Sequence, residues 1–114
     1  MNKAQQIVGF SANREKNDFY ATPEESTEKL LRVVTFRGRI YEPCCGQGHI
    51  SKVLIKHGYK VFSSDLVDRG YGTPRIDFLM ETQKHDNIVT NPPFKNALEF
   101  AERALELSRY KVAL

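Results

Sequence analysis

The segment Arg39-Ile-Tyr-Glu-Pro-Cys-Cys-Gly-Gln-Gly48 gives the first indication of how this chain folds. Its first four residues are typical of a short strand, Pro43 ends that strand, and Gly46 and Gly48 form a tight loop. Helically spaced apolar residues follow the loop as far as Gly58. A strand, a glycine loop and a helix in this order predict an α/β fold with a parallel sheet.

A helix is predicted before this segment. Thr22 can cap it, Pro23 suits its first position, and Glu25 completes a capping box. The helix should end near residues 36–38. Residues 1–17 show no sustained periodicity, so we expect a polar N-terminal arm there and a folded domain over 18–114.

Further strands are predicted after the segment. Residues 60–65 form the second strand, a glycine-rich turn leads to a third short strand that ends at Asp77, and residues 87–90 form the fourth. Another helix begins near Asn96, and residues 111–114 are typical of the start of a fifth strand. We therefore expect an α/β domain with a mostly parallel sheet and flanking helices, cut off after the start of strand five.

Composition limits the class of protein. The chain has 114 residues and a mass of 13.1 kDa, which suits one domain, and 17 Lys and Arg against 14 Asp and Glu give a net charge of +3. This charge is compatible with a nucleic-acid partner without requiring one. No apolar run approaches the roughly 20 residues of a transmembrane helix. The adjacent Cys44 and Cys45 argue against a disulfide, so we expect a cytoplasmic protein with no membrane contact.

Two features at the ends of the first and second strands are typical of ligand binding. Gly46 and Gly48 have no side chains, so a ligand can approach the backbone closely. Glu42 precedes the loop, and an acid there suits a cationic amino or sulfonium group better than a pyrophosphate. Asp65 ends the second strand, where Rossmann-like folds hold ribose hydroxyls. The structural alternatives are a tight turn and an ordinary strand-end aspartate.

The segment Asn91-Pro-Pro-Phe94 directly follows the fourth strand. Its two prolines stiffen it and hold the Asn91 side-chain carbonyl and the Pro92 carbonyl as acceptors. Phe94 adds a flat apolar face, so the group suits a planar amine with two N–H bonds. A rigid turn with a core phenylalanine is the alternative. We expect this segment and the glycine loop to open onto one cleft, because they follow neighbouring parallel strands.

Together these motifs resemble the S-adenosylmethionine (SAM)-dependent adenine-N6 DNA methyltransferases, in particular the small phage and prophage type. The resemblance rests on residues 42–48, Asp65, 77–78 and 91–94, and residues 18–23 look like the extra N-terminal cofactor motif of those enzymes. It implies a Rossmann-like methyltransferase fold with SAM as cofactor. It also implies methyl transfer to the exocyclic amine of adenine in DNA.

The resemblance assigns a catalytic role to the segment after the fourth strand. Asn91 and Pro92 would accept hydrogen bonds from the target amine, and Phe94 would stack on a base flipped out of the duplex. Pro93 completes this segment.

The resemblance also implies a set of cofactor-binding residues: Tyr20, Thr22, Glu42, Pro43, Cys44, Gly46, Gly48, Asp65, Leu66, Asp77 and Phe78. Tyr20 and Thr22 would lie at the methionine end of the cofactor. Asp65 would hold the ribose hydroxyls, and Asp77 with the Phe78 backbone would bind the adenine.

Two departures from the family pattern leave other functions open. A cysteine pair replaces the usual small residue of the first loop, which we interpret as tight packing and not as a nucleophile. The chain also ends before the later strands that normally help to grip the target. The alternatives are therefore an RNA or protein-glutamine methyltransferase, or a truncated, non-catalytic SAM-binding module. An open strand edge predicts a homodimer, and the scattered His49, His57 and His85 predict no metal site.

Overall fold

The computed structural model describes residues 20–114. Its sheet has four strands in the order β2-β1-β3-β4. These strands are β1 (Ile40–Glu42), β2 (Val61–Ser63), β3 (His85–Val89) and β4 (Ser108–Ala113). Every pairing between them is parallel. The α/β fold with a parallel sheet, predicted from the sequence, is therefore confirmed. The polar arm predicted at residues 1–17 lies outside the described residues.

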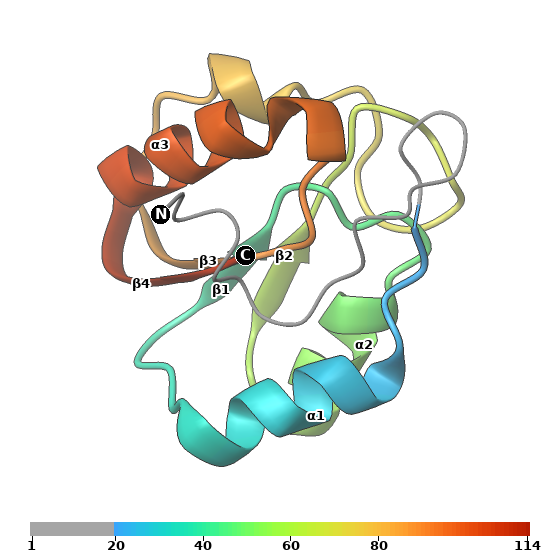
Figure 1. Ribbon diagram of the computed structural model, residues 1–114, viewed down its shortest axis with the longest axis vertical. Coiled ribbons are helices and arrows are strands. Elements are labelled where there is room, and N and C mark those ends of the chain that lie inside the picture. Colours follow the sequence, from blue (N-terminus) through green and yellow to red (C-terminus); the bar gives the residue numbers. More distant parts are fainter. Residues whose placement is uncertain (1–19) are drawn as a thin grey trace.

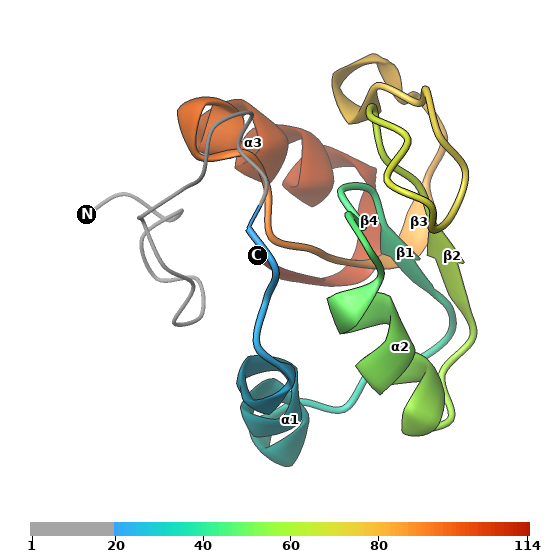
Figure 2. The same cartoon turned by 90° about the vertical axis from the view of Figure 1, so that its right-hand side faces the viewer.

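Helices cover both faces of the sheet (Figure 1). Within residues 20–114 the α-helices are α1 (Glu24–Val33), α2 (His49–Lys56) and α3 (Ala97–Leu107), and the short 3-10 turns are η3 (Phe78–Met80) and η4 (Phe94–Asn96). In the second view, α1 and α2 lie on one side of the sheet and α3 lies on the other (Figure 2).

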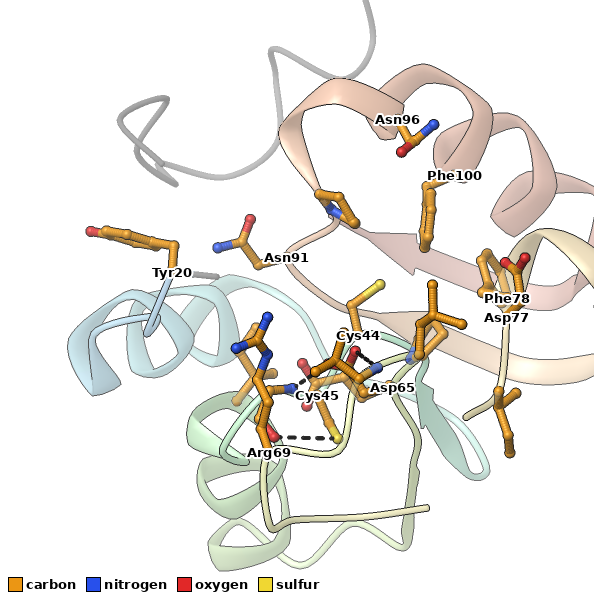
Figure 3. A pocket seen from close by; sticks show the side chains of 18 of the residues that line it. Tyr20, Cys44, Cys45, Asp65, Arg69, Asp77, Phe78, Asn91, Asn96 and Phe100 are labelled. Atoms are coloured by element: carbon orange, nitrogen blue, oxygen red, sulfur yellow. Dashed lines mark hydrogen bonds between the residues drawn. The ribbon is translucent and has the colours of Figure 1, made fainter. Parts of the chain in front are cut away.

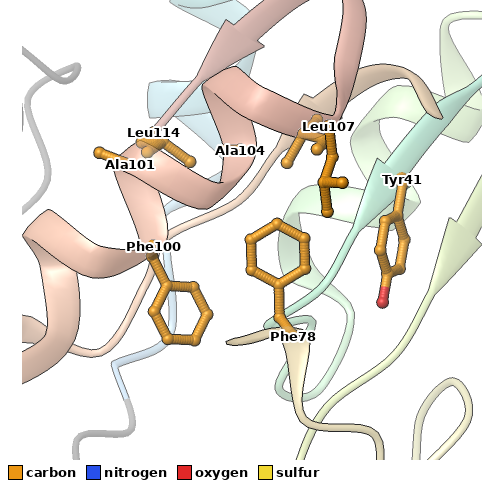
Figure 4. Packing of buried hydrophobic residues seen from close by; sticks show 8 residues of the cluster. Tyr41, Phe78, Phe100, Ala101, Ala104, Leu107 and Leu114 are labelled. Atoms are coloured by element: carbon orange, nitrogen blue, oxygen red, sulfur yellow. The ribbon is translucent and has the colours of Figure 1, made fainter. Parts of the chain in front are cut away.

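Each face of the sheet has its own apolar cluster, because neighbouring residues of a strand point to opposite faces. Thus Ile40 and Val89 belong to one cluster, and Tyr41 and Ile88 belong to the other. The cluster under α3 comprises Tyr41, Phe78, Ile88, Phe100, Ala101, Ala104, Leu107 and Leu114 (Figure 4). The buried members of the cluster under α1 and α2 are Phe36, Ile40, Ile50, Leu54 and Val89.

The third strand predicted up to Asp77 was wrong. After β2 the chain makes only an isolated bridge between Ser64 and Thr73, and Asp77 instead caps η3, its side chain accepting the Leu79 N–H at 3.0 Å. Between β2 and η3 the backbone has a positive φ at three positions: Gly70, Gly72 and Arg75. A run of turns of this kind cannot maintain the extended conformation of a strand.

The predicted capping of α1 by Thr22 was also wrong. Pro23 occupies the N-cap position, no side chain caps the helix, and Glu25 forms an ion pair with Lys29 at 3.4 Å. Thr22 therefore lies one residue too early to reach the first amides of α1. The Thr22 hydroxyl instead accepts a hydrogen bond from the side chain of Asn91. The helix ends at Val33, a little before the predicted end, since the next residue is already extended.

A fully buried amide joins the beginnings of the strands. The Asn87 side chain donates from Nδ2 to the carbonyls of Arg37 (2.7 Å) and Arg39 (2.9 Å), and its Oδ1 accepts the Lys111 N–H at 3.2 Å. This one side chain thus connects the segment before β1 and strand β4 to strand β3.

Replacing Asn87 by alanine should lower the free energy of unfolding by about 2–4 kcal/mol, because three backbone groups lose their partner. Urea denaturation followed by circular dichroism measures this loss. The matched control is Gln83→Ala, which removes an exposed amide and should change stability by less than about 0.5 kcal/mol. Equal stabilities of the two variants would contradict the assigned role of Asn87.

Candidate functional site

A cavity of about 700 Å³ lies where β1, β2 and β3 end (Figure 3). It brings together most of the residues singled out in the sequence: Tyr20, Thr22, Glu42, Pro43, Cys44, Gly46, Asp65, Leu66, Asp77, Phe78, Asn91 and Pro93. The glycine loop and the segment after β3 therefore open onto one cavity, as expected for loops that follow adjacent parallel strands.

Glu42, at the end of β1, is one of the residues that line the cavity, although its side chain is only 1% exposed. One carboxyl oxygen accepts from the backbone N–H of Ser51, at 3.1 Å, and from the Ser51 hydroxyl, while the other accepts from the Thr90 hydroxyl at 3.3 Å. Burial raises the pKa of the Glu42 carboxyl to about 8, although these donors act in the opposite direction. A cationic ligand beside this carboxyl would stabilise its charged form.

Asp65 follows β2 and holds the glycine loop in place. One of its carboxyl oxygens accepts the Gly46 N–H at 2.8 Å, and the other accepts the Val67 N–H at 3.1 Å. Because a carboxylate has about four acceptor positions, the half-buried Asp65 retains capacity for ligand hydroxyls in addition to these two bonds. The position of Asp65 in the cavity wall fits the ribose-binding role that the resemblance implies.

The far end of the cavity is apolar. Phe78 from η3 and Phe100 from α3 contribute rings with centroids 5.4 Å apart, and the apolar side chains of Ile76 and Leu79 also line the cavity. Asp77 stands at the same end, although one of its oxygens is already bonded to the Leu79 backbone. A flat heterocycle with an exocyclic amine fits such a combination of aromatic rings and an acid.

The segment after β3 forms the opposite wall. Asn91 is 8% exposed, and its Nδ2 donates to Thr22 Oγ1 at 3.3 Å. Pro93 lines the cavity with it, but Pro92 and Phe94 are not among the described lining residues. Phe94 begins η4 and is 56% exposed, so it is not the core phenylalanine of the structural alternative.

Gly48 shapes the turn of the glycine loop. It is not one of the described residues that line the cavity. It occupies the N-cap position of α2 at φ 88°, and a Cβ there would lie 2.7 Å from the Tyr71 ring. Glycine is therefore required for the turn and for this close approach.

Both thiols of the cysteine pair are held in the neutral form. Burial raises the pKa of Cys44 well above its usual value and that of Cys45 to about 12, and the nearby acids Glu42 and Asp65 add to both shifts. Cys45 Sγ donates to the Tyr71 carbonyl at 3.4 Å. Neutral, packed thiols agree with a structural role for the pair, since the thiolate is the nucleophile.

Sequence reasoning missed several lining residues: Cys45, His49, Ile50, Val67, Arg69, Ile76, Leu79, Lys95, Asn96 and Phe100. Phe100 had a signal, because it follows the segment after β3 on the apolar side of the next helix. Arg69 and Lys95 had none, since in a sequence a charged residue that lines a cavity cannot be distinguished from any other surface charge. Within residues 20–114, no group of three His, Cys, Asp or Glu side chains is arranged to hold a metal ion, and no helix is long and apolar enough to cross a membrane.

The free energy of unfolding should fall as the pH rises from 5 to 8, because the folded protein binds the Glu42 proton more tightly than the unfolded chain. This stability is fully present below the pKa of 4.5 that Glu42 has in the unfolded chain, and it is lost as the pH rises through its folded pKa of about 8. Glu42→Gln keeps an acceptor for Ser51 but cannot bind the proton. It should therefore reduce the slope of the free energy of unfolding against pH by several tenths of a kcal/mol per pH unit. Urea denaturation at each pH measures this slope.

Glu28 and Asp86 do not disturb this test. Hydrogen bonds to His57 and to the Arg39 backbone, respectively, lower their pKa values. They therefore change stability only at pH values below the window. Identical pH slopes of the parent and of Glu42→Gln would contradict a proton bound at Glu42.

Two solved structures are similar to this chain. A "putative RNA methyltransferase" from Pyrococcus horikoshii aligns with a TM-score of 0.67 and 20% identity, over 92% of this chain and 64% of that one. Magnesium protoporphyrin IX methyltransferase from Synechocystis PCC 6803, solved with bound SAM, aligns with a TM-score of 0.57 and 17% identity, over 75% of this chain and 54% of that one. The chain thus spans less than two thirds of either protein.

The sequence matches no protein-family model and no curated protein sequence. The chain has the Rossmann-like fold of SAM-dependent methyltransferases.

Proposed function

We propose that this chain binds SAM in the cavity and transfers its methyl group to the exocyclic amine of adenine in DNA. The observation that carries the proposal is the meeting of Gly46, Asp65 and Asn91 around one cavity. The methyltransferase class is also supported by the two similar solved structures.

The residues that line the cavity match the successive parts of a SAM molecule in size and chemistry. Its volume of about 700 Å³ lies within the usual range of ligand pockets. Gly46, at φ 56°, allows the ligand to approach the loop backbone. Glu42 would face the cationic end, Asp65 the ribose hydroxyls, and Phe78 the adenine ring.

Bound SAM supplies a methyl group activated by a positively charged sulfur. Asn91 Oδ1 and the Pro92 carbonyl would accept hydrogen bonds from the two N–H groups of the target amine, which localises the nitrogen lone pair and stabilises the positive charge that develops there. Flipping a base out of a duplex costs a few kcal/mol, and stacking on the exposed Phe94 ring would return about 1–3 kcal/mol. The chain would thus both align and activate the amine.

Asp65→Ala should weaken SAM binding by a factor of about 10–100, because both the charge-assisted bonds to the ribose and the anchor of Gly46 are lost. Isothermal titration calorimetry measures the affinity. Asp68→Ala is the matched control: it removes an exposed acid three residues further along the same loop and should leave the affinity within about threefold. Absence of SAM binding by the parent chain would refute the proposed cofactor.

Asn91→Ala should keep SAM affinity within about threefold while methyl transfer to an adenine-containing oligonucleotide falls at least about 100-fold, because the lost acceptor acts mainly in the transition state. Labelled SAM and a duplex of mixed sequence provide the assay, with Gln83→Ala as control. Equal transfer rates of Asn91→Ala and the parent would rule out the role of Asn91.

RNA is the second candidate substrate, since one of the similar structures is that of a protein described as an RNA methyltransferase. An RNA of the same sequence and a glutamine-containing peptide, tested beside the DNA, separate the three acceptors. SAM binding without transfer to any of them would assign the chain to the non-catalytic class. Pairing of two copies through the edge of β4 or β2 is a further proposal, because these strands form the two edges of the described sheet.

A further inference from the structure

Lys95 lines the cavity and has no charged or hydrogen-bonded partner for its side chain within residues 20–114. It lies in η4, the turn that continues the segment after β3, and it is exposed. An ammonium group has three hydrogen-bond donors and no acceptor. Lys95 therefore has capacity for an anionic ligand at the wall of the cavity.

Most other lysines of the described chain are engaged. Their partners are an acid for Lys29 and Lys56, the Tyr71 ring for Lys52, and a backbone carbonyl for Lys84 and Lys111. Lys60 is the exception: it is exposed, has no such partner within residues 20–114, and precedes β2 at the end of the sheet opposite to the cavity. Lys60 is therefore a matched control for Lys95.

The acids of the cavity do not neutralise Lys95. The carboxyl groups among the described lining residues belong to Glu42, Asp65 and Asp77. Each accepts hydrogen bonds from other groups, and none of them forms an ion pair with Lys95. A phosphate that approaches these acids would be repelled by the charged ones among them, and a cation on the same wall offsets this repulsion.

Two anions of the proposed reaction could pair with Lys95: the carboxylate of SAM and a phosphate of the DNA. The place of Lys95 in the chain favours the phosphate, because Lys95 adjoins Phe94 and follows Asn91 by four residues, and both were assigned to the target base. A flipped base enters the cavity while its phosphates stay outside. There they can reach an exposed group such as Lys95, but not the buried Glu42.

We propose that Lys95 binds a phosphate next to the target adenine and so positions the nucleotide in the cavity. Lysine binds phosphate as a point charge, and such contacts fix the register of a protein on a strand without reading its sequence. The inference rests on the proposed function and names a second part of the substrate that the site recognises. Because a glutamine side chain carries no phosphate, the contact also favours a nucleic acid over a peptide.

Lys95→Gln and Lys60→Gln test the inference, since each removes the charge of one exposed lysine. Fluorescence anisotropy measures the binding of a labelled single-stranded oligonucleotide with one adenine over a range of salt concentrations. Lys95→Gln should weaken binding by about 3–10-fold and lower the slope of log Kd against log salt concentration by about 0.7, the value for one phosphate contact. Lys60→Gln should stay within about twofold of the parent. Equal effects of the two variants, or no binding by the parent, would overturn the inference.

A neutral phosphate identifies the group that Lys95 contacts. A methylphosphonate carries no charge, and it can replace the phosphate on either side of the adenine. At one of the two positions it should weaken binding by the parent about as much as Lys95→Gln does, and it should have no further effect on Lys95→Gln. If the two effects multiply at both positions, Lys95 contacts neither phosphate, and the inference is wrong.

SAM binding and methyl transfer separate this inference from the proposed function. Isothermal titration calorimetry should give a SAM affinity for Lys95→Gln within about threefold of the parent, whereas a larger loss would assign Lys95 to the SAM carboxylate and overturn the inference. If the parent transfers methyl groups with the same KM for DNA as Lys95→Gln, the inference fails and the proposed function stands. If the oligonucleotide results are as expected but the parent transfers no methyl group, the proposed function fails and the phosphate contact stands.

Discussion

The buried carboxyl of Glu42 is the interaction on which the arrangement of the strand ends depends. It is bonded to Ser51 of α2 and to Thr90 after β3, and the Ser51 hydroxyl lies 2.6 Å from that of Ser63 in β2. A carboxyl buried without such partners would cost several kcal/mol, so these polar groups must fold together. Since β1 and β2 have only three residues each, this polar centre adds an essential connection to the few backbone bonds between them.

The same centre sets the geometry of the cavity above it. The Thr90 hydroxyl that donates to Glu42 also accepts the Cys44 N–H at 3.1 Å, and Asp65 accepts the Gly46 N–H. Each loop of the wall is thus bonded to its neighbour across the sheet. A ligand that enters this cavity would meet a preformed wall, which lowers the entropy cost of binding.

Much of this arrangement could be predicted from single residues. The strand, loop and helix of residues 39–58 follow from local patterns, and loops after adjacent parallel strands must meet, which placed Asn91 opposite Gly46. The third strand failed because Arg75, which follows the predicted turn, has a φ of 61°, and because Asp77 caps η3 instead of ending a strand. The hydroxyl of Thr22 was assigned to the nearest helix, whereas its partner Asn91 is a long-range contact that no local rule reveals.

The strand order has a consequence for how the chain folds. β1 pairs with β2 through Ile40 and Val61, but the other edge of β1 must wait for Asn87 of β3, which is synthesised 47 residues after Ile40 (87 minus 40). Non-local pairings of this kind raise the contact order and slow folding. The β1–α2–β2 unit would therefore form first, and the edge of β1 that later pairs with β3 would stay unpaired until β3 has been synthesised.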